Sequence, residues 1–159
     1  MNAALRLSWY KFKHHYMDFV KVLLGIVAFE GLILYIQDKG FLKDFETTRM
    51  TLFLLLFSTS LLIVVQNSIY ISKERSVLNR DFFSGLSRSA FALASMGIHA
   101  FFAVLETIVF ILSYSVFSKF FDKEFPDAGH IFASYRWEVG ITVLLVFLAS
   151  HFIALFISA

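Results

Sequence analysis

Four long apolar runs alternate with shorter polar stretches along the chain. The runs cover residues 19–37, 50–71, 91–117 and 137–158. Their apolar positions are continuous rather than alternating, and each run is long enough to cross a hydrocarbon layer of about 30 Å as a helix of roughly 20 residues. A transmembrane barrel needs many more segments with alternating polarity. The pattern therefore predicts an all-α fold, a polytopic transmembrane bundle of about four spans over residues 19–159.

Composition strengthens this prediction and excludes several functions. Hydrophobic residues make up 58% of the chain and charged residues only 16%, which is outside the range of ordinary soluble domains. The net charge of +2 resides in the segments that flank the spans, so the lipid bilayer is an expected partner and a nucleic acid is not. The sequence has no cysteine and no Gly-rich phosphate loop, so we expect no thiolate metal site, no bound cofactor and no ATP hydrolysis by this chain alone.

The amino-terminal segment, residues 1–18, has an amphipathic pattern of its own. Apolar residues recur there at steps of three and four, which places them on one face of a helix: Leu5, Trp9, Phe12, Tyr16 and Phe19. We expect an interfacial helix that lies in the membrane surface and connects to the first span. The alternative is a cytoplasmic extension of that span.

Lysine and arginine positions predict the orientation. Cytoplasmic flanks of spans carry an excess of these residues. The amino-terminal segment and the middle loop are richer in them than the two remaining loops: Arg6, Lys11, Lys13 and Lys21, then Lys73, Arg75, Arg80 and Arg88. We therefore expect a cytoplasmic amino terminus in a plasma membrane, such as a bacterial inner membrane.

The stretch from Lys73 to Ala94 resembles the segment that joins the second and third spans of type-2 ABC transporter permeases, especially the ABCG-like exporters. Five positions match that pattern, namely Glu74, Arg75, Arg80, Gly85 and Ser89. Asp81 and Phe91 are conservative replacements, whereas Leu78 and Ser87 stand where aromatic residues are common. The family has six spans, so the chain resembles its first four and looks like an incomplete permease.

This resemblance implies a non-catalytic permease subunit of an ATP-driven exporter. A partner ABC ATPase would bind the ATP, and a second permease copy or half would complete the transporter. The loop 73–90 would be the coupling element that contacts the ATPase, through Glu74, Arg75, Arg80, Asp81 and Gly85. The alternative for this segment is a solvated basic loop that only fixes topology.

The second apolar run carries a polar stripe. Helical spacing places its members on one face or beside it: Thr59, Ser60, Gln66, Asn67 and Tyr70. Such a stripe faces other helices or a water-filled cavity. In the family it resembles, this span lines the transport path. Ordinary hydrogen bonding between helices is equally open.

Four ionisable residues fall inside the predicted spans, namely Glu30, His99, Glu106 and His151. A charge in hydrocarbon is costly, so each must be neutral, paired or in contact with water. His99 and His151 have similar distances from the expected cytoplasmic ends of their spans, and His99 shares a helical face with Glu106. We expect an intramembrane polar cluster, either structural or a proton relay. Competing functions are a redox subunit with both histidines on haem or a metal, and a channel or structural subunit.

Overall fold

The computed structural model describes residues 10, 16–37, 45–83, 85, 87–122 and 134–158, and within them the chain forms four α-helices and no strand. The helices are α2 (Tyr16–Ile36), α3 (Phe45–Phe83), α4 (Arg88–Phe120) and α5 (Tyr135–Ser158). All four contain a segment long and apolar enough to cross a membrane. The predicted all-α bundle of four spans is therefore confirmed. The predicted interfacial helix over 1–18 lies outside the described residues, apart from Tyr10 and residues 16–18, the last of which belong to α2.

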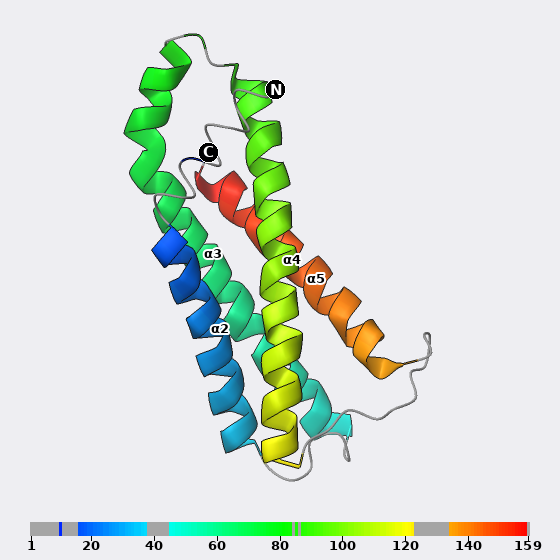
Figure 1. Cartoon of the computed structure of the whole chain (residues 1–159). Helices are drawn as coiled ribbons and strands as arrows, with labels where there is room; N and C mark the ends of the chain where they lie inside the picture. The colour runs from blue at the N-terminus through cyan, green and yellow to red at the C-terminus, as the bar shows by residue number, and fades with distance from the viewer. Residues whose placement is uncertain are drawn as a thin grey trace.

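The four helices form a ring in which α2 and α5 each pack against both α3 and α4. Helices α3 and α4, although consecutive in the chain, make little direct contact in the part of the chain described. Figure 1 shows α5 crossing the bundle obliquely, with its carboxyl end toward the α3–α4 connection and its amino end at the opposite end of the bundle. Helices α3 and α4 are therefore connected mainly indirectly, through α5 and α2, which pack against both of them.

The centre of the bundle is filled by apolar side chains from all four helices. They are Val22, Ile26, Ile63, Ala103, Phe110, Val143 and Phe147. Gly25 lets α2 pack closely against α3, because a Cβ atom at this position would lie 2.6 Å from Cδ2 of Leu62 of α3. Small residues allow helices to approach in this way when lipid supplies no hydrophobic driving force between them.

Hydroxyl groups within the helices bond to their own backbone. Oγ1 of Thr51 donates to the Thr47 carbonyl oxygen at 2.7 Å, and Oγ1 of Thr107 donates to that of Ala103 at 2.7 Å. Ser115 and Ser150 follow the same pattern, each with the carbonyl four residues earlier. A polar group in hydrocarbon needs a partner inside the protein, and the preceding helical turn supplies one.

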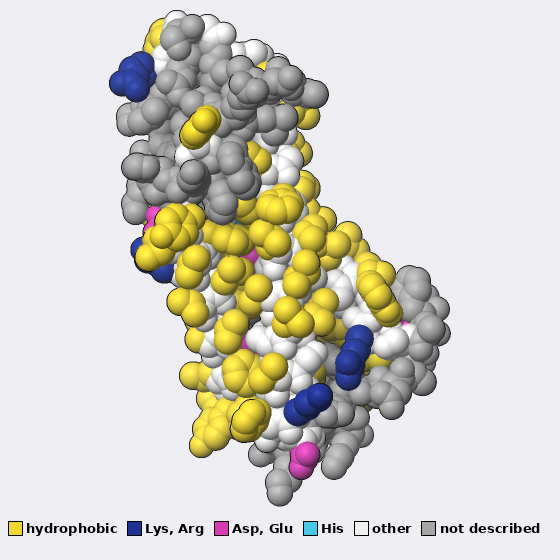
Figure 2. Space-filling model, in the orientation of Figure 1, with side chains coloured by type: hydrophobic (Ala, Val, Ile, Leu, Met, Phe, Trp, Pro, Cys, Tyr) yellow, Lys and Arg dark blue, Asp and Glu magenta, His cyan; other side chains and the backbone are white. Residues whose placement is uncertain are grey.

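The outer surface of the bundle is apolar along its middle. Figure 2 shows hydrophobic side chains covering the central part of the visible face, with Lys and Arg side chains toward the two ends. Large apolar residues face outward on every helix, such as Leu24, Phe57, Leu112 and Leu145, each more than half exposed. An apolar surface of this extent on four helices of spanning length matches the acyl chains of a bilayer. The protein is therefore an integral membrane protein.

Helix α3 is longer than predicted. Its membrane-spanning segment is Phe45–Ile69, but the helix continues through residues 70–83, for a total of 39 residues. At 1.5 Å per residue it measures about 58 Å, and the part beyond Ile69 about 20 Å. Residues 73–90, expected as a loop, are thus helical as far as Phe83 and again from Arg88. We call the segment 70–88 the α3–α4 hairpin.

The turn of the hairpin has identifiable local causes. Gly85 has a φ of +99°, a conformation that side chains rarely adopt, and open space surrounds it. Ser87 is the N-cap of α4, where its Oγ accepts a hydrogen bond from the Ala90 backbone N–H at 3.5 Å. Glycine therefore permits the reversal of the chain, and serine begins the returning helix.

Candidate functional site

A buried polar cluster joins three helices. His151 of α5 lies at its centre and is 0% exposed. Its Nε2 is 2.8 Å from Oε2 of Glu106 in α4, and its Nδ1 is 3.0 Å from both Nδ1 of His99 in α4 and Nδ2 of Asn67 in α3. Glu106 is 1% exposed and His99 is 6% exposed. We call Asn67, His99, Glu106 and His151 the polar cluster.

The hydrogen-bonding capacity of His151 limits how the polar cluster can be protonated. An ionised Glu106 only accepts, so Nε2 of His151 carries the hydrogen that it receives. Nδ1 of a neutral His151 has one lone pair, yet two groups lie at bonding distance, so Asn67 and His99 compete for it. When both His151 nitrogens are protonated, Nδ1–H donates to His99 instead. The direction of the hydrogen bond between the two imidazoles therefore depends on the protonation of His151.

The polar cluster connects α3 and α4, the two helices that the hairpin joins. Asn67 lies near the end of the spanning segment of α3, and His99 lies in the first half of α4. These two helices make little direct contact. His151 of α5 lies between them and hydrogen-bonds to Asn67 of α3 and His99 of α4. The polar cluster is thus a hydrogen-bonded link between α3 and α4 in the described part of the bundle.

Glu30 belongs to a second site. It is 0% exposed in α2 and accepts a short hydrogen bond from Oγ of Ser113 in α4. Its other oxygen, Oε1, is buried without a hydrogen-bond partner among the described residues. The expected single group of Glu30, His99, Glu106 and His151 is therefore divided, because Glu30 bonds to Ser113 and the other three bond to one another.

The polar stripe predicted on the second span is distributed over different environments. Thr59 is 0% exposed, and its Oγ1 donates to the Leu55 carbonyl oxygen at 2.6 Å. Gln66 is half-buried, and Oγ of Ser60 is buried without a partner in the described part of the chain. Asn67 joins the polar cluster, while the side chain of Tyr70 lies outside the described residues. Thr59 and Asn67 therefore face neighbouring helices.

The expected coupling residues lie on the hairpin. The backbones of Glu74, Arg75 and Asp81 belong to α3, but their side chains are outside the described part of the chain. Arg80 is exposed and Gly85 forms the turn. The apolar ring of Phe83 is 94% exposed, and this residue lies well beyond the end of the spanning segment of α3 at Ile69. Phe83 was not among the predicted coupling residues.

The candidate haem or metal ligands, His99 and His151, face each other in the polar cluster. Among the residues that the structure describes, no group of three or more His, Asp or Glu side chains is arranged to hold a metal ion. The nitrogens of His99 and His151 that face each other are 3.0 Å apart and engage in a mutual hydrogen bond.

Two site residues were missed from the sequence, and a signal existed for only one of them. Ser113 follows Glu106 by the same seven-residue step that separates Glu106 from His99, so the three share one face of α4. Glu138 lies in the first turn of α5, where acidic residues are common for helix stability alone. The structure places it in a pocket described below.

Comparison with protein-family models, with curated proteins and with solved structures finds no match to this chain.

Proposed function

We propose that this chain is a permease subunit of an ATP-driven exporter, and that a separate ATPase docks on the α3–α4 hairpin. The observation that carries the proposal is the hairpin itself. A stretch that resembles the coupling segment of type-2 ABC permeases lies on a helix that projects about 20 Å beyond the spanning segment and turns back at Gly85.

The exposed side chains of the hairpin are suited to a protein partner. Phe83 is 94% exposed and lies 14 residues beyond the end of the spanning segment of α3. The exposed Arg80 and Arg88 lie on either side of it in the sequence. Aromatic residues and arginine are enriched in the centres of protein interfaces. A segment that only fixed topology would need the cations but not an exposed aromatic ring.

The polar cluster supplies the second part of the mechanism. Movement of the hairpin displaces α3 and α4 together, provided that the two helices are linked where they enter the bundle. His151 provides that link through Asn67 on one side and His99 with Glu106 on the other. Two copies of such a subunit, each driven through its hairpin, then alternate between inward and outward access as a dimer.

The test compares two double variants of the tagged chain purified from its native membranes. Arg80→Glu with Phe83→Ser alters the hairpin, whereas Arg49→Glu with Phe120→Ser makes the same chemical changes at the opposite end, where Phe120 is 82% exposed. We expect vanadate-sensitive ATP hydrolysis to co-purify with the wild type and the control, and to fall at least tenfold in the hairpin variant. Equal activity in all three would exclude docking on the hairpin.

The redox alternative has a separate test. A haem subunit shows a Soret band after purification, and a metal subunit retains a stoichiometric ion. We expect neither, and a stoichiometric haem lost in a His99→Leu variant would replace the exporter proposal.

A further inference from the structure

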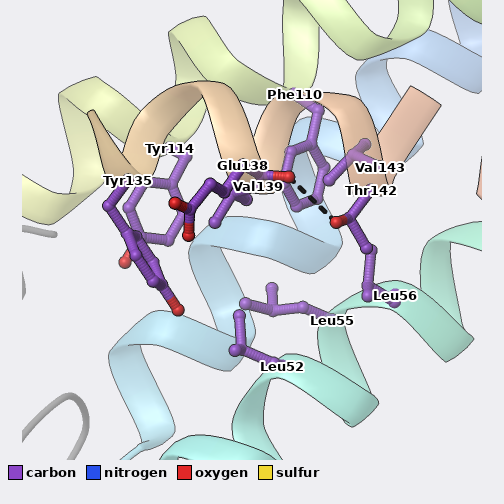
Figure 3. Close-up of a pocket in the computed structure, with 10 residues that line it drawn as sticks. All are labelled: Leu52, Leu55, Leu56, Phe110, Tyr114, Tyr135, Glu138, Val139, Thr142 and Val143. Atoms are coloured by element: carbon purple, nitrogen blue, oxygen red, sulfur yellow. Dashed lines mark hydrogen bonds between the residues drawn. The ribbon is translucent and has the colours of Figure 1, made fainter. Parts of the chain in front are cut away.

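A pocket of about 260 Å³ opens between α3, α4 and α5 at the end of the bundle opposite the hairpin. Figure 3 shows the residues that line it. Apolar side chains of α3 form one wall, and the first turns of α5 form another: Leu52, Leu55 and Leu56, with Val139, Thr142 and Val143. An apolar cavity of about 150 Å³ accommodates benzene, so this pocket has room for a ring with several substituents.

The remaining lining is aromatic and acidic. Phe110 and Tyr114 from α4 are each 3% exposed, and Tyr135 and Glu138 from α5 are half-buried. In Figure 3 the carboxylate of Glu138 lies beside the rings of Tyr114 and Tyr135, while its backbone oxygen accepts from Oγ1 of Thr142 at 2.9 Å. The pocket therefore combines three aromatic rings and one carboxylate in otherwise apolar surroundings.

This combination matches one class of ligand. The face of an aromatic ring attracts a cation, and cages of aromatic residues recognise quaternary ammonium groups. Such a cation carries methyl groups and no N–H donor, so apolar walls suit it, and a nearby carboxylate balances its charge.

We propose that this pocket binds a quaternary ammonium group attached to a small apolar moiety. The cation lies against Tyr114, Tyr135 and Glu138, and the apolar moiety lies against the leucines of α3. The pocket and the hairpin are at opposite ends of the bundle, so ligand binding does not depend on the proposed ATPase. Failure of either proposal leaves the other standing.

The test is calorimetric titration of the purified chain in maltoside micelles with benzyltrimethylammonium. We expect saturable binding that weakens at least tenfold in Glu138→Gln. The matched control is Glu46→Gln, because Glu46 is 74% exposed at the same end of the bundle and does not line the pocket. It should stay within twofold of the wild type. Tyr135→Phe keeps the ring and should bind, whereas Tyr135→Leu should lose at least fivefold.

The neutral isostere neopentylbenzene, in which carbon replaces the cationic nitrogen, separates charge recognition from simple burial. We expect it to bind at least tenfold more weakly. Equal binding of the isostere, equal binding by Glu138→Gln, or no saturable binding to folded wild type would overturn the proposal. Melting curves of each variant show whether it is folded.

The source of the cation is distinguished in nanodiscs. A phosphatidylcholine headgroup and a free cation share the same chemistry. If the headgroup is the natural occupant, phosphatidylcholine nanodiscs will weaken probe binding at least tenfold relative to phosphatidylglycerol nanodiscs. Equal affinity in the two lipids assigns the pocket to a free cation.

Discussion

His151 and Glu106 form a buried pair between α5 and α4, with Nε2 and Oε2 2.8 Å apart and both side chains 1% exposed. The same imidazole contacts His99 and Asn67 through its other nitrogen. One side chain thus holds together three helices inside the apolar part of the bundle.

Loss of His151 should destabilise the protein strongly. An interhelical hydrogen bond in a membrane contributes about 0.6 to 1.7 kcal/mol, so His151→Leu, which removes three contacts, should lower the free energy of unfolding by about 2 to 5 kcal/mol. The measurement is unfolding by dodecyl sulfate, followed by circular dichroism. The neighbouring Ser150→Ala is the control, because its hydroxyl bonds only to the Val146 carbonyl of its own helix. Similar losses in both variants would contradict the central role of His151.

Asn67 provides a functional test of the link between the hairpin arms. Asn67→Leu removes the contact from α3 to His151 but leaves the pair of His151 with Glu106 intact. We expect ATP hydrolysis by the assembled transporter to continue while transport per ATP falls at least fivefold, since α3 then moves without α4. Measuring hydrolysis and transport on the same proteoliposomes separates the two effects. A proportional fall in both would mean that Asn67 acts through assembly or stability.

Ser113 should matter through Glu30. Ser113→Ala removes the donor to a carboxyl group whose other oxygen already lacks a partner in the described structure. The expected loss is about 1 to 3 kcal/mol in the free energy of unfolding. Ser115→Ala should have little effect, because that hydroxyl bonds to the Ile111 carbonyl. Adding Glu30→Gln to Ser113→Ala should recover part of the loss, and no recovery would show that Ser113 acts independently of Glu30.

A larger side chain at Gly25 should require Leu62 to move. A Cβ atom there would lie 2.6 Å from Leu62, whereas nothing lies within 4 Å of a Cβ atom at Gly97. Overpacking costs about 1 to 3 kcal/mol, so Gly25→Val should be less stable than Gly97→Val by about that amount. Both variants change helix propensity equally, so their difference reports on the contact between α2 and α3. Equal stabilities would indicate that Leu62 moves aside without cost.

The helices were predictable because membrane-spanning segments need continuous apolar runs, and four such runs stand out. The extension of α3 was missed because residues 73–83 are rich in charged and polar side chains and were interpreted as loop. The absence of Gly and Pro between Phe45 and Phe83 was the available signal, since nothing in that stretch breaks a helix.

Pairing within the bundle was only partly predictable. The seven-residue step from His99 to Glu106 places both on one face of α4 from sequence alone. The partner of each residue depends on the rotation and tilt of neighbouring helices, which packing decides. For this reason Glu30 was grouped with the histidines, although the structure pairs it with Ser113. Asn67 was assigned to a stripe of α3 rather than to His151 for the same reason.

The most direct test of the whole account is the side of the membrane on which the hairpin lies. The chain has no native cysteine, so a single Phe83→Cys or Asp122→Cys variant carries one thiol. Both positions are exposed: Phe83 ends α3 shortly before α4 begins, and Asp122 follows the end of α4. A membrane-impermeant maleimide applied to intact cells should label Asp122→Cys, and should label Phe83→Cys only after the membrane is opened. Labelling of Phe83→Cys in intact cells would place the hairpin outside, beyond reach of an ATPase, and would contradict the proposed function.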